Sequence, residues 1–290
     1  MGSLAQSLWR LLPTRALSEA IGWGARRPIP LRVREPFLRQ FGRLYAIAVE
    51  EAEKPLREYA TLDDFFTRRL RDGLRPVDLA PGVVVGPADG VVVESGLVQE
   101  GRLLQAKGVL FGLADLLADQ DAARRLDGGA YLITYLSPRD YHRVHASAAG
   151  RVLGWHHVPG TLFSVNARSV AGVPGLFASN ERFVTLMDGE AGLCAVVMVA
   201  AVGVGHVTAA YDAEVTTHGP AFQTGVVRHK TFDPSPVLAR GAELATFHLG
   251  STTVVVFEPG RVLLDEQVAG AQSRMGRRIG RIVSPRSASG

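Results

Sequence analysis

The chain has 290 residues, of which 47% are hydrophobic, and this composition excludes a largely disordered protein. The formal net charge of +4 is modest and no aromatic–basic binding motif accompanies it, which argues against nucleic acid as a partner. A single cysteine excludes an internal disulfide bond.

The first fifty residues are basic and contain two predicted amphipathic helices. They hold eight arginines and three glutamates. The first helix carries leucines on one face, at Leu4, Leu8, Leu11 and Leu12. In the second, apolar residues recur at helical spacing, at Phe37, Leu38, Phe41, Leu44, Tyr45 and Ala48. Basic amphipathic helices lie in the headgroup layer of a bilayer, so we predict that residues 1–75 form a region that associates with an anionic membrane surface. An ordinary helical cap packed on the rest of the chain is the alternative.

The pattern changes from helical to β-rich after residue 75. Thr61 is a predicted N-cap for a helix over Leu62–Leu70. From about Val83 onward, short β-branched runs alternate with Gly and Pro, and one helical interlude is predicted at Leu110–Ala118. The runs are Val91–Val93, Ala130–Leu136, Val196–Val199, Val254–Phe257 and Val262–Leu264. We therefore predict an α+β protein with a β-rich, sandwich-like catalytic domain over 76–283 and a disordered tail over 284–290.

One apolar segment has the length of a membrane span. Ala191–Ala210 is about twenty residues long, but Gly203, Gly205 and His206 interrupt it and its valine-rich centre suits a buried strand. No signal-peptide pattern is recognisable at the amino end. We expect a peripheral protein on the cytoplasmic side of the cell membrane.

The most informative dipeptide is Gly250-Ser251, just before the predicted strand Val254–Phe257. Glycine lets the backbone bend sharply, and a serine hydroxyl becomes a nucleophile when a base removes its proton. That hydroxyl could attack the preceding carbonyl and turn the peptide into an ester. β-Elimination would then cut the chain and leave a group that hydrolyses to a pyruvoyl cofactor. Taken alone, the dipeptide is also common in ordinary turns that have no catalytic role.

A base and an orienting carboxylate are available elsewhere in the chain. His142 and His145 follow the predicted strand Ala130–Leu136 and can exchange protons near neutral pH. Asp89 precedes Gly90 in a tight turn, where an Asp is most often only a turn former. The two histidines could also form half of a metal site, but no third ligand is recognisable and we expect no metal.

Several blocks, in this order, resemble the bacterial long form of the phosphatidylserine decarboxylases. They are Leu62–Leu70, Pro87–Gly90, Gln105–Gly108, Leu136–His145, Gly160–Asn166, Asn180–Arg182 and Leu249–Thr252, and together they cover roughly residues 55–257. The resemblance implies a pyruvoyl-dependent carboxy-lyase that converts phosphatidylserine to phosphatidylethanolamine and CO2.

The resemblance also implies roles for individual residues. The proenzyme would cut itself between Gly250 and Ser251 into a β chain, 1–250, and an α chain, 251–290, which remain associated; whether such pairs dimerise further stays open. Asp89, His145 and Ser251 match the self-processing relay, and Ser251 would become the covalent pyruvoyl group and the Schiff base site. His142 matches the histidine that assists decarboxylation or returns the proton, with His145 as the second choice.

A short stretch near the middle of the chain offers groups for the substrate head group. Phe163, Ser164 and Asn166 supply an aromatic ring, a hydroxyl and an amide. The alternative is a strand in which Phe163 and Val165 form the buried face. Two rival functions also remain: a serine hydrolase that uses Asp89, His145 and Ser251 on an external substrate, and a membrane-binding β domain without activity.

Overall fold

The structure is a computed structural model of the single 290-residue chain. It describes residues 14–106, 108–203, 206–219, 222–249 and 251–283. The predicted leucine face of the first helix and the predicted tail over 284–290 lie outside the described residues.

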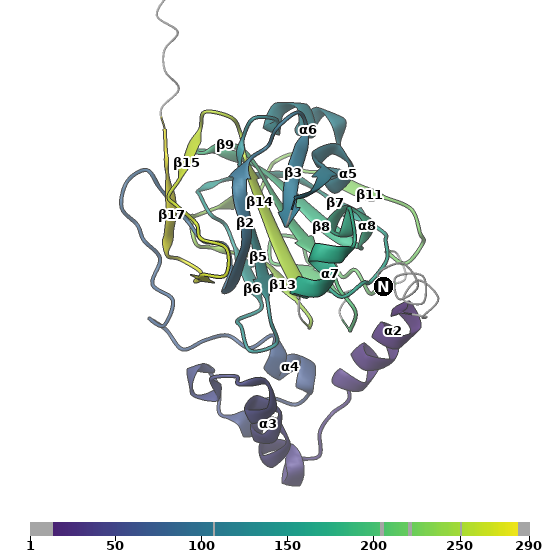
Figure 1. The fold of residues 1–290 in the computed structure, drawn as a ribbon. Coiled ribbons are helices and arrows are strands. Elements are labelled where there is room, and N and C mark those ends of the chain that lie inside the picture. Colours follow the sequence, from purple (N-terminus) through teal and green to yellow (C-terminus); the bar gives the residue numbers. More distant parts are fainter. Residues whose placement is uncertain (1–13, 107, 204–205, 220–221, 250, 284–290) are drawn as a thin grey trace, which may run out of the picture.

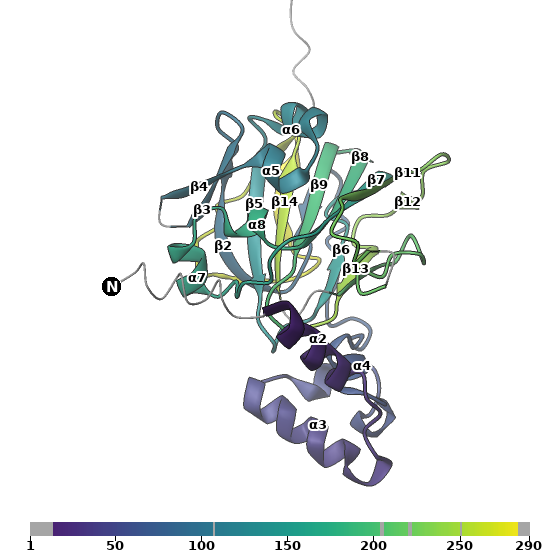
Figure 2. The same cartoon turned by 90° about the vertical axis from the view of Figure 1, so that its right-hand side faces the viewer.

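The amino-terminal part is helical and projects from one end of the β-rich part (Figures 1 and 2). Its elements are α2 (Thr14–Ala25), α3 (Leu31–Tyr45), the 3-10 helices η1 (Val49–Glu51) and η2 (Leu56–Glu58), and α4 (Leu62–Phe66). The segment from α3 to α4 encloses a small apolar cluster of its own, separate from the main core. Its buried members are Leu38, Ile47, Ala52, Leu56, Tyr59 and Phe65.

Two predicted helices end earlier than expected. Helix α3 stops at Tyr45 because Ala46 adopts a left-handed conformation with φ 56°, so Ala48 does not continue the apolar face. In α4 the predicted N-cap is confirmed, since Thr61 Oγ1 accepts a hydrogen bond from Asp64 N at 2.9 Å. This helix ends at Phe66 rather than Leu70, with Thr67 as its C-cap; the Thr67 N–H and hydroxyl both donate to the Asp63 carbonyl, at 2.9 and 2.8 Å.

The β-rich part is built on a large central antiparallel sheet. Its strands, in spatial order, are β11 (Arg228–Thr231), β7 (Gly150–Val158), β8 (Arg182–Gly189), β9 (Gly192–Val199), β14 (Ser251–Phe257), β5 (Ala130–Leu136), β2 (Gly90–Leu97) and β16 (Gln272–Ser273), with β12 (Val237–Leu238) beside β7. The five predicted β-branched runs all lie in strands of the structure. The sheet order places β14 between β9 and β5, in the middle of the molecule (Figure 1).

Smaller sheets and short helices surround the central sheet, rather than one opposing sheet of equal size. One small sheet has the order β1 (Val83–Val85), β17 (Arg278–Ile282), β15 (Val262–Leu264), and another has the order β10 (Val207–Ala209), β13 (Glu243–Phe247), β6 (Arg143–His145). A hairpin joins β3 (Arg102–Ala106) to β4 (Val109–Gly112). The helices α5 (Leu113–Leu117), α6 (Gln120–Leu126), α7 (Ala167–Gly172) and α8 (Leu176–Ser179) lie on one face of the central sheet (Figure 2). The predicted interlude over Leu110–Ala118 therefore begins as strand β4 and is helical only from Leu113.

The core runs along the central strands. All eight residues of β9 are buried, as are Val254, Val255, Val256 and Phe257 of β14. The apolar segment over 191–210 thus contains the core strand β9, as predicted for its valine-rich centre, and it continues through a turn to β10 of a small sheet. Among the described helices, none combines the length and apolar character needed to cross a bilayer.

Candidate active site

The predicted cleavage junction lies at the start of the central strand β14. Gly250 and the side chain of Ser251 lie outside the described parts, but the Ser251 backbone begins β14 opposite Leu136, the last residue of β5. Because β5 and β14 run antiparallel, the loop after β5 leaves the sheet at the same end at which β14 begins. That loop carries His142, so the topology brings the junction and the first histidine to one end of the sheet.

His142 is fully buried and is held in one tautomer. Ser137 N and Oγ donate to the Asp140 carboxylate at 2.8 and 2.6 Å, which closes the loop, and the Asp140 carbonyl lies 2.8 Å from His142 Nδ1. A carbonyl only accepts, so Nδ1 carries the proton and Nε2 has a lone pair. Nε2 is buried without a hydrogen-bond partner among the residues that the structure describes. Burial, followed by the positive charge of Arg68, lowers the pKa of His142 to about 3, so the imidazole is neutral at pH 7.

His142 also lies beside the segment that leads to the junction. Phe247 N donates to its carbonyl at 2.9 Å, and Phe247 is the last residue of β13, four residues before Ser251. The His142 ring packs on Phe66 of α4, with 4.1 Å between the ring centroids. One histidine therefore contacts both the helical region and the strand that enters the junction.

His145 is a second neutral base, at the end of β6. Its Nδ1 lies 2.8 Å from the Gly241 carbonyl and must donate to it. The Nε2 lone pair therefore accepts from the Tyr141 hydroxyl, at 3.2 Å. Burial lowers the pKa of His145, and burial raises the pKa of Tyr141 to about 12. His145 and Tyr141 are therefore both uncharged at neutral pH, and a proton can pass between the Tyr141 hydroxyl and His145 Nε2.

Asp89 is close to His145 through the backbone, while its carboxylate has other partners. His145 N donates to the Pro87 carbonyl at 2.8 Å, which holds β6 against the turn that contains Asp89. The Asp89 carboxylate accepts from Arg75 Nε at 2.8 Å and from Met275 N at 2.9 Å, and no hydrogen bond to His145 is present. Gly90 has φ 152° and packs against the Tyr135 backbone, so only glycine fits after Asp89.

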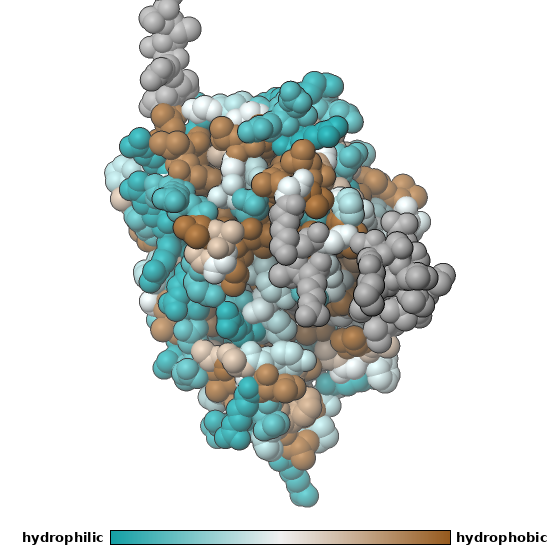
Figure 3. Space-filling model, viewed as in Figure 1, coloured by the Kyte–Doolittle hydropathy of each residue, from teal (hydrophilic) through white to brown (hydrophobic). Residues whose placement is uncertain are grey.

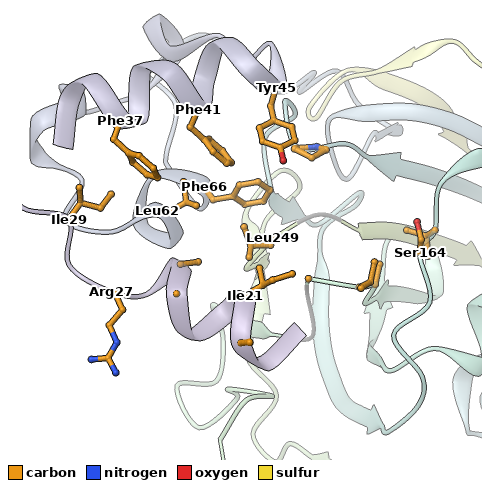
Figure 4. A pocket seen from close by; sticks show the side chains of 18 of the residues that line it. Ile21, Arg27, Ile29, Phe37, Phe41, Tyr45, Leu62, Phe66, Ser164 and Leu249 are labelled. Atoms are coloured by element: carbon orange, nitrogen blue, oxygen red, sulfur yellow. The ribbon is translucent and has the colours of Figure 1, made fainter. Parts of the chain in front are cut away.

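An apolar cavity of about 470 Å³ lies between the helical region and the β-rich part, next to the junction. Figure 4 shows Phe37, Phe41 and Tyr45 of α3 on one side and Ile21 of α2 on the other. Leu249, one residue before Gly250, lines the same cavity. The cavity can therefore hold an apolar chain with one end near the start of β14.

The three predicted substrate-binding residues are placed differently. Ser164 lines the cavity, together with Val165 (Figure 4). Phe163 is half-buried, packs against the core, and pairs through its backbone with the Asn180 side chain. Asn166 is exposed, and its Oδ1 accepts from Ser169 N at 3.0 Å at the start of α7. Substrate contact by these residues stays a prediction, with Ser164 the best placed.

A cluster of histidines that sequence reasoning did not single out lies just before the junction. His248 Nδ1 is 2.9 Å from a carboxylate oxygen of Asp63, and the His248 ring stacks on His206 with 3.9 Å between centroids. His218 lies beside His206, with 5.2 Å between centroids. Among the described residues, no group of three or more His, Cys, Asp and Glu side chains could hold a metal ion. Asp63 and His248 are 185 residues apart, so no local sequence signal could have paired them.

The comparison with known families places the chain clearly. The family model described as phosphatidylserine decarboxylase matches residues 62–281. This range contains α4, all the strands except the last residue of β17, and every predicted site residue.

Curated relatives match over nearly the whole chain. A phosphatidylserine decarboxylase proenzyme of Myxococcus xanthus (strain DK1622) is 45% identical over 274 residues, covering 94% of this chain and 96% of the relative. The proenzyme of Anaeromyxobacter sp. (strain K) is 46% identical, with 94% and 96% covered. That of Escherichia coli (strain 55989 / EAEC) is 38% identical, with 92% and 84% covered.

Proposed function

Because this chain belongs to the phosphatidylserine decarboxylase family, we propose that it removes the serine carboxyl group of phosphatidylserine, giving phosphatidylethanolamine and CO2, after cutting itself between Gly250 and Ser251. The observation that carries the proposal is the apolar cavity lined by Leu249, which joins the helical region to the start of β14. A lipid substrate needs an apolar space with a reactive group at its end, and the cavity supports the proposal because it lies next to the residue pair at which that group would form.

The self-cleavage is written on the chain's own atoms. The Ser251 hydroxyl oxygen bonds to the Gly250 carbonyl carbon, the C–N bond breaks, and the hydroxyl proton ends on the nitrogen of residue 251. A base then removes the Cα proton of residue 251 and the Cβ–Oγ bond breaks, which frees a carboxylate on Gly250. Water adds to the dehydroalanine left at residue 251 and ammonia leaves, so that a pyruvoyl group heads the α chain, 251–290, which stays bound to the β chain, 1–250.

We assign these proton transfers to His145, the residue that the resemblance implies. Its neutral ring and the Nε2 lone pair toward Tyr141 allow it to take a proton. Asp89 acts on it indirectly: its carboxylate fixes the turn through Arg75 and the Met275 backbone, and the Pro87 carbonyl of that turn holds the His145 backbone. Asp89, His145 and Ser251 thus keep the relay roles that the resemblance implies, with Asp89 as an orienting group.

The surroundings fit a pyruvoyl group at residue 251, because the buried Nε2 of His142 has an unused lone pair. When present, this group supplies an electron-withdrawing carbonyl that accepts the electron pair left by the departing carboxyl group. The serine ammonium of the substrate must lose a proton before its nitrogen reacts, and His142 Nε2 is the proposed acceptor once the negative charges of the substrate offset the charge of Arg68. The imidazolium can then give that proton to the α-carbon from which CO2 has left.

The helical region is the proposed contact with an anionic membrane surface, on the cytoplasmic side. Val33, Phe37 and Leu44 of α3 lie on one face and are 50%, 47% and 73% exposed. Arginines flank this face at Arg32, Arg39 and Arg43. Figure 3 shows hydrophobic residues among hydrophilic ones on the projecting helical end. The division into a membrane-associating region, 1–75, and a catalytic domain, 76–283, is supported by their two separate apolar clusters.

The deciding experiment compares the purified wild-type chain with Ser251→Ala. We expect the wild type to give two pieces on a denaturing gel, the smaller with the mass of residues 251–290 and a blocked amino terminus, and to release CO2 from phosphatidylserine vesicles. Ser251→Ala should remain one chain and release none. An intact wild-type chain that decarboxylates lipid, or a Ser251→Ala chain that still splits, would refute the proposal. An intact chain that hydrolyses esters would favour a serine hydrolase instead.

A further inference from the structure

The segment that leads into the junction contains a backbone conformation that other contacts must hold. Leu249 has φ 79°, in the left-handed region that residues with a side chain rarely adopt. The chain is anchored on both sides of it. On one side His248 N donates to the His206 carbonyl at 3.0 Å, and on the other Ser251 enters the central sheet. Only residues 248–250 connect β13, in a small sheet, to β14, in the central one.

The His248 side chain is fixed at both nitrogens and on one face. Its Nδ1 lies 3.0 and 2.9 Å from the two carboxylate oxygens of Asp63, and its Nε2 lies 3.2 Å from Thr208 Oγ1. One face stacks on the His206 ring, with the planes 21° apart. The side chains of His248 and Asp63 are only 16% and 15% exposed, so water competes weakly for this pair.

The two partners of this pair come from different parts of the fold. Asp63 lies in the first turn of α4, in the helical region, while His248 belongs to the β-rich part (Figure 1). Phe66 of the same helix lines the cavity with Leu249. Helix α4 thus directly contacts His248, the residue that precedes the left-handed Leu249.

We propose that Asp63 and His248 are positioning residues for the self-cleavage: Asp63 holds His248, this clamp maintains the left-handed backbone at Leu249, and cleavage is fast only when α4 is docked. The inference rests on the proposed function, because it concerns the same junction. The hydroxyl of Ser251 must reach the carbonyl of Gly250, and the backbone one residue earlier sets how that peptide unit is directed. Coupling to α4 would delay cofactor formation until the helical region has folded onto the site.

The first test measures cleavage rates of the full chain made by cell-free translation. We expect Asp63→Asn and His248→Gln each to slow cleavage at least tenfold. Asp63→Glu keeps the carboxylate and should recover part of the rate. The double variant Asp63→Asn/His248→Gln should cleave no more slowly than the slower single variant, because both changes remove the same contact. The matched control is Asp64→Asn, since Asp64 is the next residue of α4 and its carboxylate accepts from Ala60 N instead. It should cleave within about twofold of the wild type.

A second background separates positioning from folding. Glycine adopts a positive φ without strain, so Leu249→Gly should reduce the effect of Asp63→Asn to less than threefold. The inference would be overturned if Asp63→Asn slowed cleavage equally in both backgrounds, or if Asp63→Asn cleaved at the wild-type rate. The proposed function would still stand in either case, provided that the wild type cleaves at Ser251. Should Asp63→Asn be insoluble, His248→Gln, which leaves α4 unchanged, decides by the same criteria.

Discussion

The protonation state of His142 follows from where the chain places it. The ring is completely buried, packs on Phe66, and is near the Arg68 guanidinium. Arg68 is itself buried, and its Nε and Nη1 have no hydrogen-bond partner among the described residues. A second positive charge beside Arg68 is therefore unfavourable, and His142 stays neutral until a substrate brings negative charge close to it.

This burial predicts a pH dependence of stability. The pKa of His142 is about 3 when folded and near 6.5 when unfolded, so the unfolded chain binds more protons between these values and stability falls as the pH falls from 6.5 toward 3. In a Ser251→Ala background, replacing His142 by Gln should reduce the loss of unfolding free energy between pH 7 and pH 5 by about 2 kcal/mol. Urea unfolding at the two pH values measures this difference.

An exposed histidine provides the control for this measurement. His229 lies exposed on β11, so His229→Gln should leave the pH dependence of the unfolding free energy unchanged. An unchanged pH dependence in His142→Gln would show that His142 is not held neutral by burial. With Ser251 restored, His142→Gln should still cleave itself but lose roughly 10²–10⁴-fold in lipid decarboxylation, the range that a missing acid–base group costs.

At the scale of elements, Arg75 ties the helical region to the turn before β2. The Arg75 Nη2 atom lies 2.6 Å from Asp89 Oδ2 and 2.9 Å from Oε2 of Glu51 in η1, and the Arg75 side chain is only 10% exposed. Both carboxylates depend on one guanidinium for their charge balance. The turn that orients His145 is therefore held in place from the helical side.

Removing this guanidinium should affect both stability and processing. Arg75→Met leaves two partly buried carboxylates unpaired, which typically costs about 3–5 kcal/mol, and the loosened turn should slow self-cleavage. The matched control is Arg278→Met, whose partner Asp265 is 44% exposed; exposed pairs contribute about 0–1 kcal/mol. Chemical unfolding in the Ser251→Ala background and cleavage kinetics in the native sequence measure the two effects. Equal destabilisation by both variants would contradict this role of Arg75.

The sequence predicted strands better than helix ends or side-chain partners. Runs such as Val254–Phe257 lie between two neighbouring strands in the core, so continuous β-branched residues identify them directly. The ends of α3 and α4 lie at the C-caps Ala46 and Thr67, which no periodicity reveals. The segments of Asp89 and His145 were recognisable because each is a short local motif. The binding of Asp89 to Arg75 depends on how the chain folds, so it was visible only in the structure.

At the scale of the whole molecule, the helical region has two apolar sides with different environments. Leu38 is buried in the region's own cluster, whereas Val33 and Leu44 remain exposed on α3. The cavity next to the junction opens between this region and the β-rich part. In the proposed membrane contact, this cavity would supply an apolar space between α3 and the start of β14.

This arrangement predicts that the exposed face of α3 determines membrane binding. The double variant Val33→Ser/Leu44→Ser removes two exposed apolar side chains without changing any that line the cavity. Inserting each of them fully into lipid would contribute roughly 1.5–3 kcal/mol, so cosedimentation with vesicles containing phosphatidylserine should weaken at least tenfold. Decarboxylation of vesicle lipid should fall in parallel, and activity on dispersed short-chain phosphatidylserine should stay close to that of the wild type.

The control for this face is an equally exposed residue of the β-rich part. Val237 on β12 is 74% exposed, and Val237→Ser should bind vesicles as the wild type does. If Val33→Ser/Leu44→Ser bound vesicles as tightly as Val237→Ser, α3 would be a structural cap rather than the membrane contact. If instead activity on dispersed short-chain lipid fell as far as activity on vesicles, the defect would lie in the site and not at the membrane, because only the vesicle assay requires the protein to reach a bilayer.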